Sequence, residues 1–330
     1  MSGRVVRVLA AAALAWAAGA AAEANDSTAE IAAGGLVFTK SAEIEMRSEG
    51  LFISAKEIRV AYSFVNTSGR DVRVRVAFPL PDLDGALIQG DSSIPDPASD
   101  NFVDFATLID GHPVHSAVEH RAVLKGKDVT QTLRALALPL DPLDQTHMDG
   151  RWAKLNAGQR KSLLAQGLVA DGECGEDCAQ WTLKTTYWWE QLFPAGRSLS
   201  VEHRYRPVVG ESAGAALAYL ESSELQAYRA KYCIDDAFMA AVARLKRANP
   251  NIIGTEQRID YVLKTGANWK TPIGSFRLVV DKGAPRNLIS FCASGLRKIG
   301  PTRFELRRSN FRPDRDLSIL IIRPPGPHGG

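Results

Sequence analysis

Hydrophobic and polar residues alternate along much of the first third of the chain. Residues 58–64 and 72–78 follow the period of two that a half-buried strand shows, with apolar residues on one face and Arg, Ala or Ser on the other. Asn66 to Gly69 supply turn-forming residues between them. The pattern therefore predicts an antiparallel hairpin.

A second hairpin is predicted a little further along. Its strands are residues 102–109 and 112–121, and the Asp110-Gly111 pair between them is the dipeptide that a type I′ turn favours. The chain as far as residue 128 is therefore expected to be antiparallel β.

The period then changes to that of a helix. Thr130 is placed to cap a short helix that ends near residue 137. Asn156 can cap a second helix through Gln166, with Gly167 as its C-terminal glycine. These two helices are predicted to form a connector.

Strand-like alternation returns after the connector. Residues 181–192 and 197–206 are predicted strands, and they loosely repeat the pattern of residues 58–79, which suggests a duplicated unit. One helix is predicted from Asp236 to Arg247, with Asp235 as its cap. Further strands are predicted over residues 257–264, 274–281, 288–292, 302–308 and 317–322.

These elements predict a mainly β chain with two antiparallel β-sandwich-like domains, a helical connector and a short helical insert. Its 330 residues suffice for about two domains. The predicted parts are a signal peptide (1–24), an N-terminal β domain (25–128), the connector (129–172), a C-terminal β domain (173–323) with its helical insert near 235–247, and a disordered tail (324–330).

Composition excludes several classes of protein. With 45% hydrophobic and 23% charged residues and a mean hydropathy of −0.12, the chain is neither disordered nor a polytopic membrane protein. Its 40 Lys and Arg against 37 Asp and Glu leave a net charge of +3, so nucleic acid is not an expected partner.

The first residues have the pattern of a secretory signal peptide. Arg4 and Arg7 precede an apolar stretch over residues 8–18, and an A-x-A pattern ends at Ala24. Cleavage is predicted after Ala24, with a cut after Ala22 as the alternative, and an uncleaved N-terminal anchor is a further possibility. The mature protein is then expected in the periplasm, with no membrane span after cleavage.

Four cysteines, which can pair in three ways, suit an oxidising compartment. Cys174 and Cys178 enclose only three residues, so a local bridge is the easiest to close, and Cys233 is left with Cys292. Both bridges are interpreted as structural, because neither zinc-ligand spacing nor a C-x-x-C redox motif is present.

Longer motifs carry two family resemblances. Residues 58–85, IRVAYSFVNTSGRDVRVRVAFPLPDLDG, resemble the opening of the vault protein inter-alpha-trypsin domain, where a hairpin with an Asn-containing turn leads into an FPLP-type strand end. The whole mature chain resembles an uncharacterised family of exported proteobacterial proteins with a domain of unknown function. The motifs of this second resemblance are NDSTAE, FPLPD, KGKDVT, EHRYRP, YCIDDAF, TGANWKTPIG and FELRRSNFRPDRDL. It implies export and periplasmic residence, and no activity.

One motif points to catalysis. Gly210 to Gly214 match G-x-S-x-G, with Ser212 between a predicted strand and a helix-compatible run. A hydrolase of this type also needs a histidine later in the chain, and the single one is His328 in the tail. A serine hydrolase using Ser212 is therefore the alternative function. No catalytic residue and no cofactor is predicted. No metal is predicted either, because His115 would point to the opposite face of a strand from His112 and His120, and these two stand too far apart to share an ion.

Aromatic residues are the best candidates for binding. Period two places Tyr187 and Trp189 on one face of a strand and Trp188 on the other. Trp188 and the loop residues Trp269 and Lys270 are the candidate ligand-binding residues, with a plug at the end of the core as the alternative for Trp269. The predicted function is a non-catalytic binding or interaction module whose partner is an unknown periplasmic protein or small molecule.

Overall fold

The structure is a computed structural model that describes residues 26–32, 35–85, 92–172, 175–215, 217, 220–248 and 254–325. The predicted signal peptide and residues 326–330 of the predicted tail lie outside the described residues. Within that part of the chain, no helix has both the length and the apolar character that a membrane span requires.

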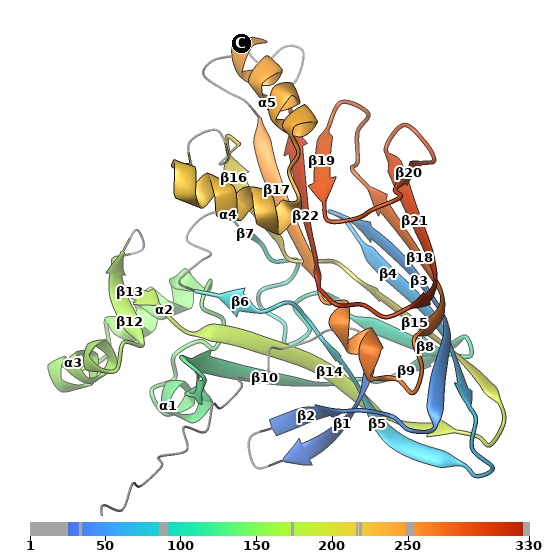
Figure 1. The fold of residues 1–330 in the computed structure, drawn as a ribbon. Coiled ribbons are helices and arrows are strands. Elements are labelled where there is room, and N and C mark those ends of the chain that lie inside the picture. Colours follow the sequence, from blue (N-terminus) through green and yellow to red (C-terminus); the bar gives the residue numbers. More distant parts are fainter. Residues whose placement is uncertain are drawn as a thin grey trace, which may run out of the picture.

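The chain is mainly β, as the alternation predicts, and its described strands form three large sheets and one small one (Figure 1). Sheet A has the order β11-β10-β14-β5-β1-β2, with β6 beside β14. Its strands are β1 (Ser27–Ala32), β2 (Gly35–Thr39), β5 (Val72–Pro79), β6 (Leu83–Asp84), β10 (Ala117–Leu124), β11 (Lys127–Asp128) and β14 (Thr182–Phe193).

Sheet B is the largest and has the order β20-β21-β18-β3-β4-β15-β8-β9. Its strands are β3 (Ile44–Ser54), β4 (Ile58–Asn66), β8 (Ala106–Ile109), β9 (His112–Val114), β15 (Ser198–Tyr205), β18 (Ile273–Asp281), β20 (Arg297–Lys298) and β21 (Arg303–Phe311).

Sheet C has the order β19-β22-β17-β16-β7. Its strands are β7 (Ser92–Ser93), β16 (Val209–Ala213), β17 (Thr255–Tyr261), β19 (Leu288–Phe291) and β22 (Leu317–Arg323), and a separate small hairpin is formed by β12 (Val169–Gly172) and β13 (Gly175–Ala179). Inward-facing residues of sheets A, B and C pack into one hydrophobic cluster, so the three sheets share a core.

The helices are α1 (Thr130–Ala135), α2 (Gln145–Trp152), α3 (Ala157–Ala165), α4 (Ser222–Tyr232) and α5 (Asp236–Ala248), with a 3₁₀ turn over Lys264–Asn268. The predicted caps of α3 and α5 are confirmed, because Asn156 forms a capping box and Asp235 accepts a hydrogen bond from the Phe238 amide. The cap predicted at Thr130 is wrong, since its hydroxyl accepts from the Ala122 amide of β10 instead. Helices α2 and α4 were not predicted.

The first predicted hairpin is wrong, although both of its strands exist. Strand β4 pairs with β3 and β15 in sheet B, and β5 pairs with β14 and β1 in sheet A. The turn between them therefore carries the chain from one sheet to the other. Strands β14 and β15, which are joined by residues 194–197, make the reverse crossing. Turn-forming residues serve a crossing as well as a hairpin, so composition alone could not separate the two.

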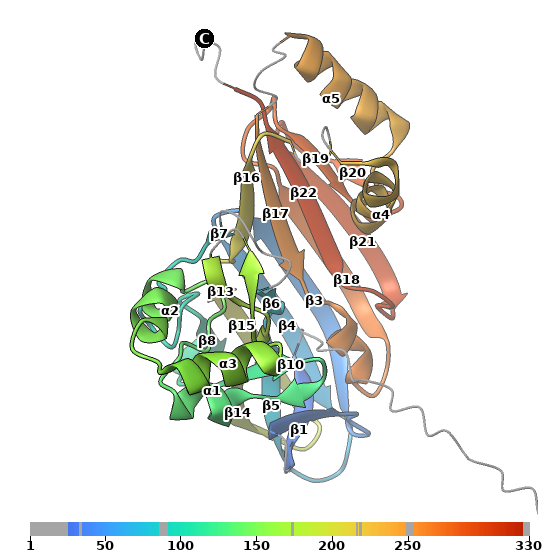
Figure 2. The same ribbon diagram turned by 90° about the vertical axis from the view of Figure 1, so that its left-hand side faces the viewer.

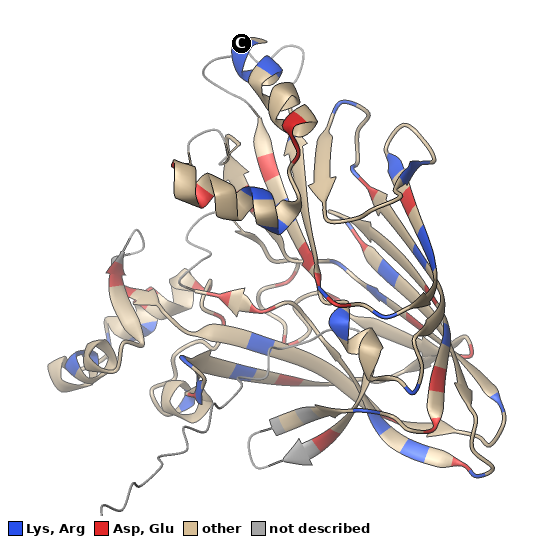
Figure 3. Ribbon diagram, viewed as in Figure 1, with Lys and Arg blue, Asp and Glu red and all other residues tan. Residues whose placement is uncertain are grey.

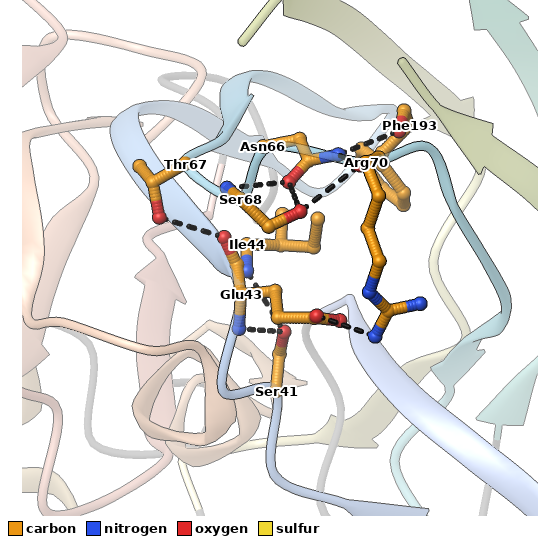
Figure 4. A network of polar contacts seen from close by, with 8 residues as sticks. All are labelled: Ser41, Glu43, Ile44, Asn66, Thr67, Ser68, Arg70 and Phe193. Carbon is orange, nitrogen blue, oxygen red and sulfur yellow. Dashed lines mark hydrogen bonds and ion pairs between the residues drawn. The ribbon is translucent and has the colours of Figure 1, made fainter. Parts of the chain in front are cut away.

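The two crossings dock on each other through Asn66, which is fully buried (Figure 4). Its Nδ2 donates to the carbonyl oxygens of Arg70 and Phe193, each at 2.8 Å, and its Oδ1 accepts from the Ser68 amide at 2.9 Å. Its main chain bonds the other crossing too, because the Gly196 amide donates to the Asn66 carbonyl. One side chain thus satisfies polar groups of both connections.

The second hairpin is confirmed at its turn. Asp110 and Gly111 have φ of 49° and 79°, as a type I′ turn requires, and β8 pairs with β9 across them. The returning strand does not run on to residue 121 in the same sheet, however. It breaks after Val114, and β10 joins sheet A beside β14.

The predicted boundaries do not separate two sets of sheets. Strand β18 lies parallel to β3, with Arg277 beside Gly50, and β14 lies antiparallel to β5. Segments 25–128 and 173–323 therefore share sheets A and B, and a division into an N-terminal and a C-terminal β domain does not describe the strand pairing. Long-range pairing of this kind leaves no local signal in the sequence.

A buried polar chain crosses the core. His203 Nε2 lies 3.0 Å from Asp26 Oδ1, and its Nδ1 lies 3.1 Å from the hydroxyl of Thr107. Burial raises the pKa of Asp26 above its usual value, against the opposing effect of His203. The Trp269 indole also donates to the Asp26 carbonyl at 2.7 Å. The segment at Asp26 is thus an integral part of the core.

We expect Asn66→Ala to lower the free energy of unfolding by about 3 kcal/mol, because a buried carbonyl group, that of Phe193, and a part-buried one, that of Arg70, lose their donor. Asn66→Asp keeps the shape but loses both donors, so it should destabilise at least as much. The control is Thr67→Ala, which removes two exposed hydrogen bonds, one to the Glu43 carbonyl and one from Lys270 Nζ, and should cost below about 1 kcal/mol. Urea unfolding measures all three, and equal stabilities of the Asn66 and Thr67 variants would contradict the assignment.

Candidate ligand-binding surface

The outer face of sheet B, the sheet with the most described strands, lies away from the described helices. Helices α1 to α3 pack near sheet A and the small hairpin, and α4 and α5 pack on sheet C. All five lie on the side of the molecule away from this face (Figures 1 and 2). Alternation along each strand sends apolar side chains into the core and leaves polar side chains outside.

Three arginines converge on one buried carboxylate at the β20–β21 end of this face. Glu305, whose side chain is 3% exposed, accepts from Arg277 Nε at 2.8 Å and from Arg307 Nη2 at 2.9 Å through the same oxygen. Its other oxygen accepts from Arg297 Nη2 at 2.5 Å. The three arginine side chains are 49%, 65% and 70% exposed for Arg277, Arg307 and Arg297. We call these four residues the Glu305 cluster.

The cluster keeps its charge under all ordinary conditions. Hydrogen bonds from the three guanidinium groups hold the pKa of Glu305 well below its usual range. Three guanidinium charges against one carboxylate therefore leave a net charge of +2. Figure 3 shows Lys and Arg gathered on this end of sheet B.

A second group of arginines lies further along the same face. Glu57 forms ion pairs with Arg59, at 3.2 Å, and with Arg204, at 2.7 Å. The Arg59 guanidinium lies 4.7 Å from the centre of the Phe52 ring, and that of Arg303 lies 5.8 Å from it. Phe52 thus lies between Arg59 and Arg303, and Arg303 itself is paired with Asp281 at 2.9 Å.

A row of serines crosses the same face. In register order across five neighbouring strands, one serine stands beside the next: Ser309, Ser275, Ser48, Ser63 and Ser200. Among the described residues, no intramolecular hydrogen bond uses any of these hydroxyls, so they are open to solvent or a ligand.

Gly50 lies two residues along β3 from Ser48, on the same face, between Arg277 and Ala61. A Cβ there would meet a single neighbour, the Ala61 carbonyl oxygen at 3.8 Å, and its φ is outside the left-handed range. The fold therefore does not require glycine at this position. A glycine inside a strand that the fold does not need is typical of a place where another molecule approaches closely.

Trp269 does not belong to a surface site. Its side chain is 2% exposed, and its ring centre lies 4.5 Å from that of Phe64 in the core. A surface ligand cannot reach it, so its location is that of the plug considered as the alternative. Lys270 beside it is exposed, and its Nζ contacts the Thr67 hydroxyl at 2.7 Å.

Trp188 lies on a different face from Lys270. It is partly exposed on the outer side of sheet A, with the Arg75 guanidinium 4.5 Å from its ring centre. Tyr187 and Trp189 point into the core, as the period of two predicts. The three candidate ligand-binding residues are therefore not brought together, and a binding role for Trp188 stays a prediction.

Ser212 lacks the surroundings of a nucleophile. It lies inside strand β16, where it pairs with Glu256, and its hydroxyl donates to the Gly214 carbonyl at 3.2 Å. In the described part of the chain no histidine hydrogen-bonds it, and no group of three metal-ligating residues is found. Helix α4 begins at Ser222.

The disulfide between Cys233 and Cys292 is confirmed. It ties the C-terminal end of α4 to the end of β19. Cys174 lies outside the described residues, so its pairing with Cys178 stays a prediction.

Sequence reasoning missed the Glu305 cluster, although one signal was present. Arg303, Glu305 and Arg307 recur at period two, which puts three charged side chains on one face of a strand. Arg277 and Arg297 come from other strands, so nothing local indicated that they meet at Glu305.

The chain belongs to the family described as "Domain of unknown function (DUF4424)", which matches residues 24–320. No curated protein matches the chain by sequence. Among solved structures, a "putative nutrient binding protein" from Legionella pneumophila subsp. pneumophila str. Philadelphia 1 is 15% identical, with 91% of this chain and 70% of that chain covered and a TM-score of 0.45. That score is too low to show a shared fold.

We expect Trp269→Ala to lower the free energy of unfolding by about 3–5 kcal/mol, because it empties a large site in the core. Trp188→Ala removes a partly exposed ring and should cost about 1 kcal/mol. Thermal or urea unfolding of both variants measures the difference. A Trp269→Ala protein as stable as the Trp188→Ala protein would mean that the indole does not support the core.

Proposed function

We propose that the chain is an exported, non-catalytic binding module whose ligand is an acidic glycan that docks on the outer face of sheet B. The observation that carries the proposal is the Glu305 cluster, which holds a surplus of positive charge in a fixed geometry on an uncovered sheet face. Guanidinium groups bind carboxylate, sulfate and phosphate groups through paired N–H donors.

The rest of the face favours a glycan over an acidic protein. Protein interfaces depend on buried aromatic or aliphatic anchors. Among the described residues, Phe52 is the large ring that these arginines contact, with Arg59 and Arg303 over it, so the face offers little of the apolar surface that a protein partner needs. Serine hydroxyls both donate and accept hydrogen bonds, as sugar hydroxyls do. Because Gly50 has no side chain, an extended chain can lie close to the backbone of the sheet at this position.

Export and periplasmic residence are part of this proposal. The N-terminal segment has the pattern of a signal peptide, and a disulfide such as Cys233–Cys292 is typical of oxidising compartments. A proteobacterial origin and the resemblance to the vault protein inter-alpha-trypsin domain remain hypotheses, and the proposal does not depend on them. Ser212 inside its strand gives no support to the hydrolase alternative.

Dextran sulfate and neutral dextran test the proposal, because they share a backbone and differ in charge. We expect the mature protein to bind dextran sulfate and not dextran. Combining Arg59→Gln, Arg277→Gln and Arg307→Gln should lower the affinity at least about tenfold, since charge-assisted hydrogen bonds are lost. Isothermal titration calorimetry at physiological salt measures the affinities.

The matched control removes three positive charges from the side that carries α3. Lys125→Gln, Lys154→Gln and Lys161→Gln together should leave the affinity within about twofold, because at physiological salt charges are screened beyond about 8 Å. A second variant, Gly50→Val, should fold normally and weaken binding, because the added side chain would occupy the space in which the ligand is proposed to lie. Equal losses in the two triple variants would show that net charge, and not this face, governs binding.

The export part has its own test. N-terminal sequencing of protein purified from the periplasm of an expressing bacterium should begin at Asn25, or at Glu23 if the alternative cut is used. Recovery of the protein in the cytoplasm with its first residues intact would contradict export.

A further inference from the structure

We infer that the Glu305 cluster is a preorganised site for a phosphate monoester dianion, in which Glu305 is a positioning residue. The inference rests on the proposed function, which it deepens by naming the acidic group that the glycan carries. The ligand group is a phosphate linked to carbon through one oxygen, with its other three oxygens free to accept hydrogen bonds.

The charge of the cluster and the number of its guanidinium groups both favour a phosphate monoester over a carboxylate. The cluster has a net charge of +2, and a phosphate monoester carries about −1.5 to −2 at pH 7, whereas a carboxylate carries one negative charge. A carboxylate has two oxygens, which a single guanidinium fork satisfies. Three guanidinium groups match the three terminal oxygens of a phosphate monoester.

The arrangement of strands fixes where these donors lie. Arg277 of β18 and Arg307 of β21 are register neighbours, and Arg297 of β20 is the register neighbour of Glu305. The guanidinium groups thus come from three adjacent strands and meet at one carboxylate. Each has five N–H donors, and one donor of each is bonded to Glu305, so most of the donors stay available to a ligand.

Glu305 acts by holding the guanidinium groups together against their mutual repulsion. Arginine side chains are long and lose much freedom on binding, so a site that fixes them beforehand loses less entropy when a ligand arrives. The effect on anion affinity that this role predicts for removal of Glu305 is opposite to the effect expected from charge alone. Removal of the carboxylate raises the positive charge of the patch, which by charge alone would strengthen anion binding.

The test uses four probes in calorimetric titrations of the mature protein. Glucose 1-phosphate and glucuronic acid compare phosphate with carboxylate on a sugar. Inorganic phosphate, and phosphatidylcholine vesicles containing phosphatidic acid, compare the other sources of phosphate. We expect saturable binding of glucose 1-phosphate, at least about tenfold tighter than that of glucuronic acid, and weaker binding of the other two phosphate sources.

Two variants separate positioning from charge. Arg277→Lys with Arg307→Lys keeps every charge and removes the fork geometry, and should weaken glucose 1-phosphate binding about tenfold. Glu305→Gln adds a net positive charge and should nevertheless weaken that binding. Because Glu305 is buried, circular dichroism checks the fold of this variant, and the double lysine variant tests the site even if Glu305→Gln fails to fold.

Specific outcomes overturn the inference. Tighter binding by a folded Glu305→Gln protein would mean that charge alone acts, and an unchanged affinity in the double lysine variant would exclude a guanidinium site. Equal binding of glucose 1-phosphate and glucuronic acid would reject the phosphate assignment. If dextran sulfate still bound through the sheet B arginines in that case, the proposed glycan-binding function would stand. If dextran sulfate binding did not depend on these arginines, the proposed function and the phosphate inference would both be wrong.

Discussion

The fold depends on one buried amide that holds two sheet crossings together. Strands β4 and β5 carry the chain from sheet B to sheet A, and β14 and β15 carry it back. Asn66 bonds the Arg70 and Phe193 carbonyl groups, one in each crossing. Since β4 pairs with β15 and β5 with β14, this corner sets the register of both sheets at once. The loose repeat of residues 58–79 in residues 181–206 corresponds to these two crossings, although Phe193-Pro194 lies in the second crossing whereas Phe78-Pro79 ends β5.

That register also builds the candidate site. Pairing of β4 with β15 places Arg59 beside Arg204, and the parallel pairing of β3 with β18 places Gly50 beside Arg277. The exposed face of sheet B is therefore assembled from strands of the first, middle and last thirds of the chain. A ligand lying across it would contact strands far apart in sequence, so binding and the long-range topology are linked.

Local patterns predicted local structure well. The alternation around Val60 and Val72, the capping box at Asn156 and the turn at Asp110 each involve residues close in sequence, and each is present. Pairing was not predictable, because the same half-buried pattern suits a strand beside any neighbour with a matching apolar face. The turn after Asn66 illustrates this limit. Its residues form a hairpin turn as readily as a crossing, and the Phe193 carbonyl that decides between them is remote in sequence.

Glu305 shows why a functional reading of the surface goes beyond stability. One guanidinium would neutralise this carboxylate, and each further arginine adds repulsion between like charges. Exposed ion pairs contribute little to folding, so two surplus arginines on an open face are not explained by the stability of the sheet. They could protect the sheet edge from pairing with another chain, as charged edge residues do. Arg277 lies on β18, however, which has strands on both sides, and edge protection does not require a charge there. The surplus charge in the interior of the sheet face is what favours an anionic ligand.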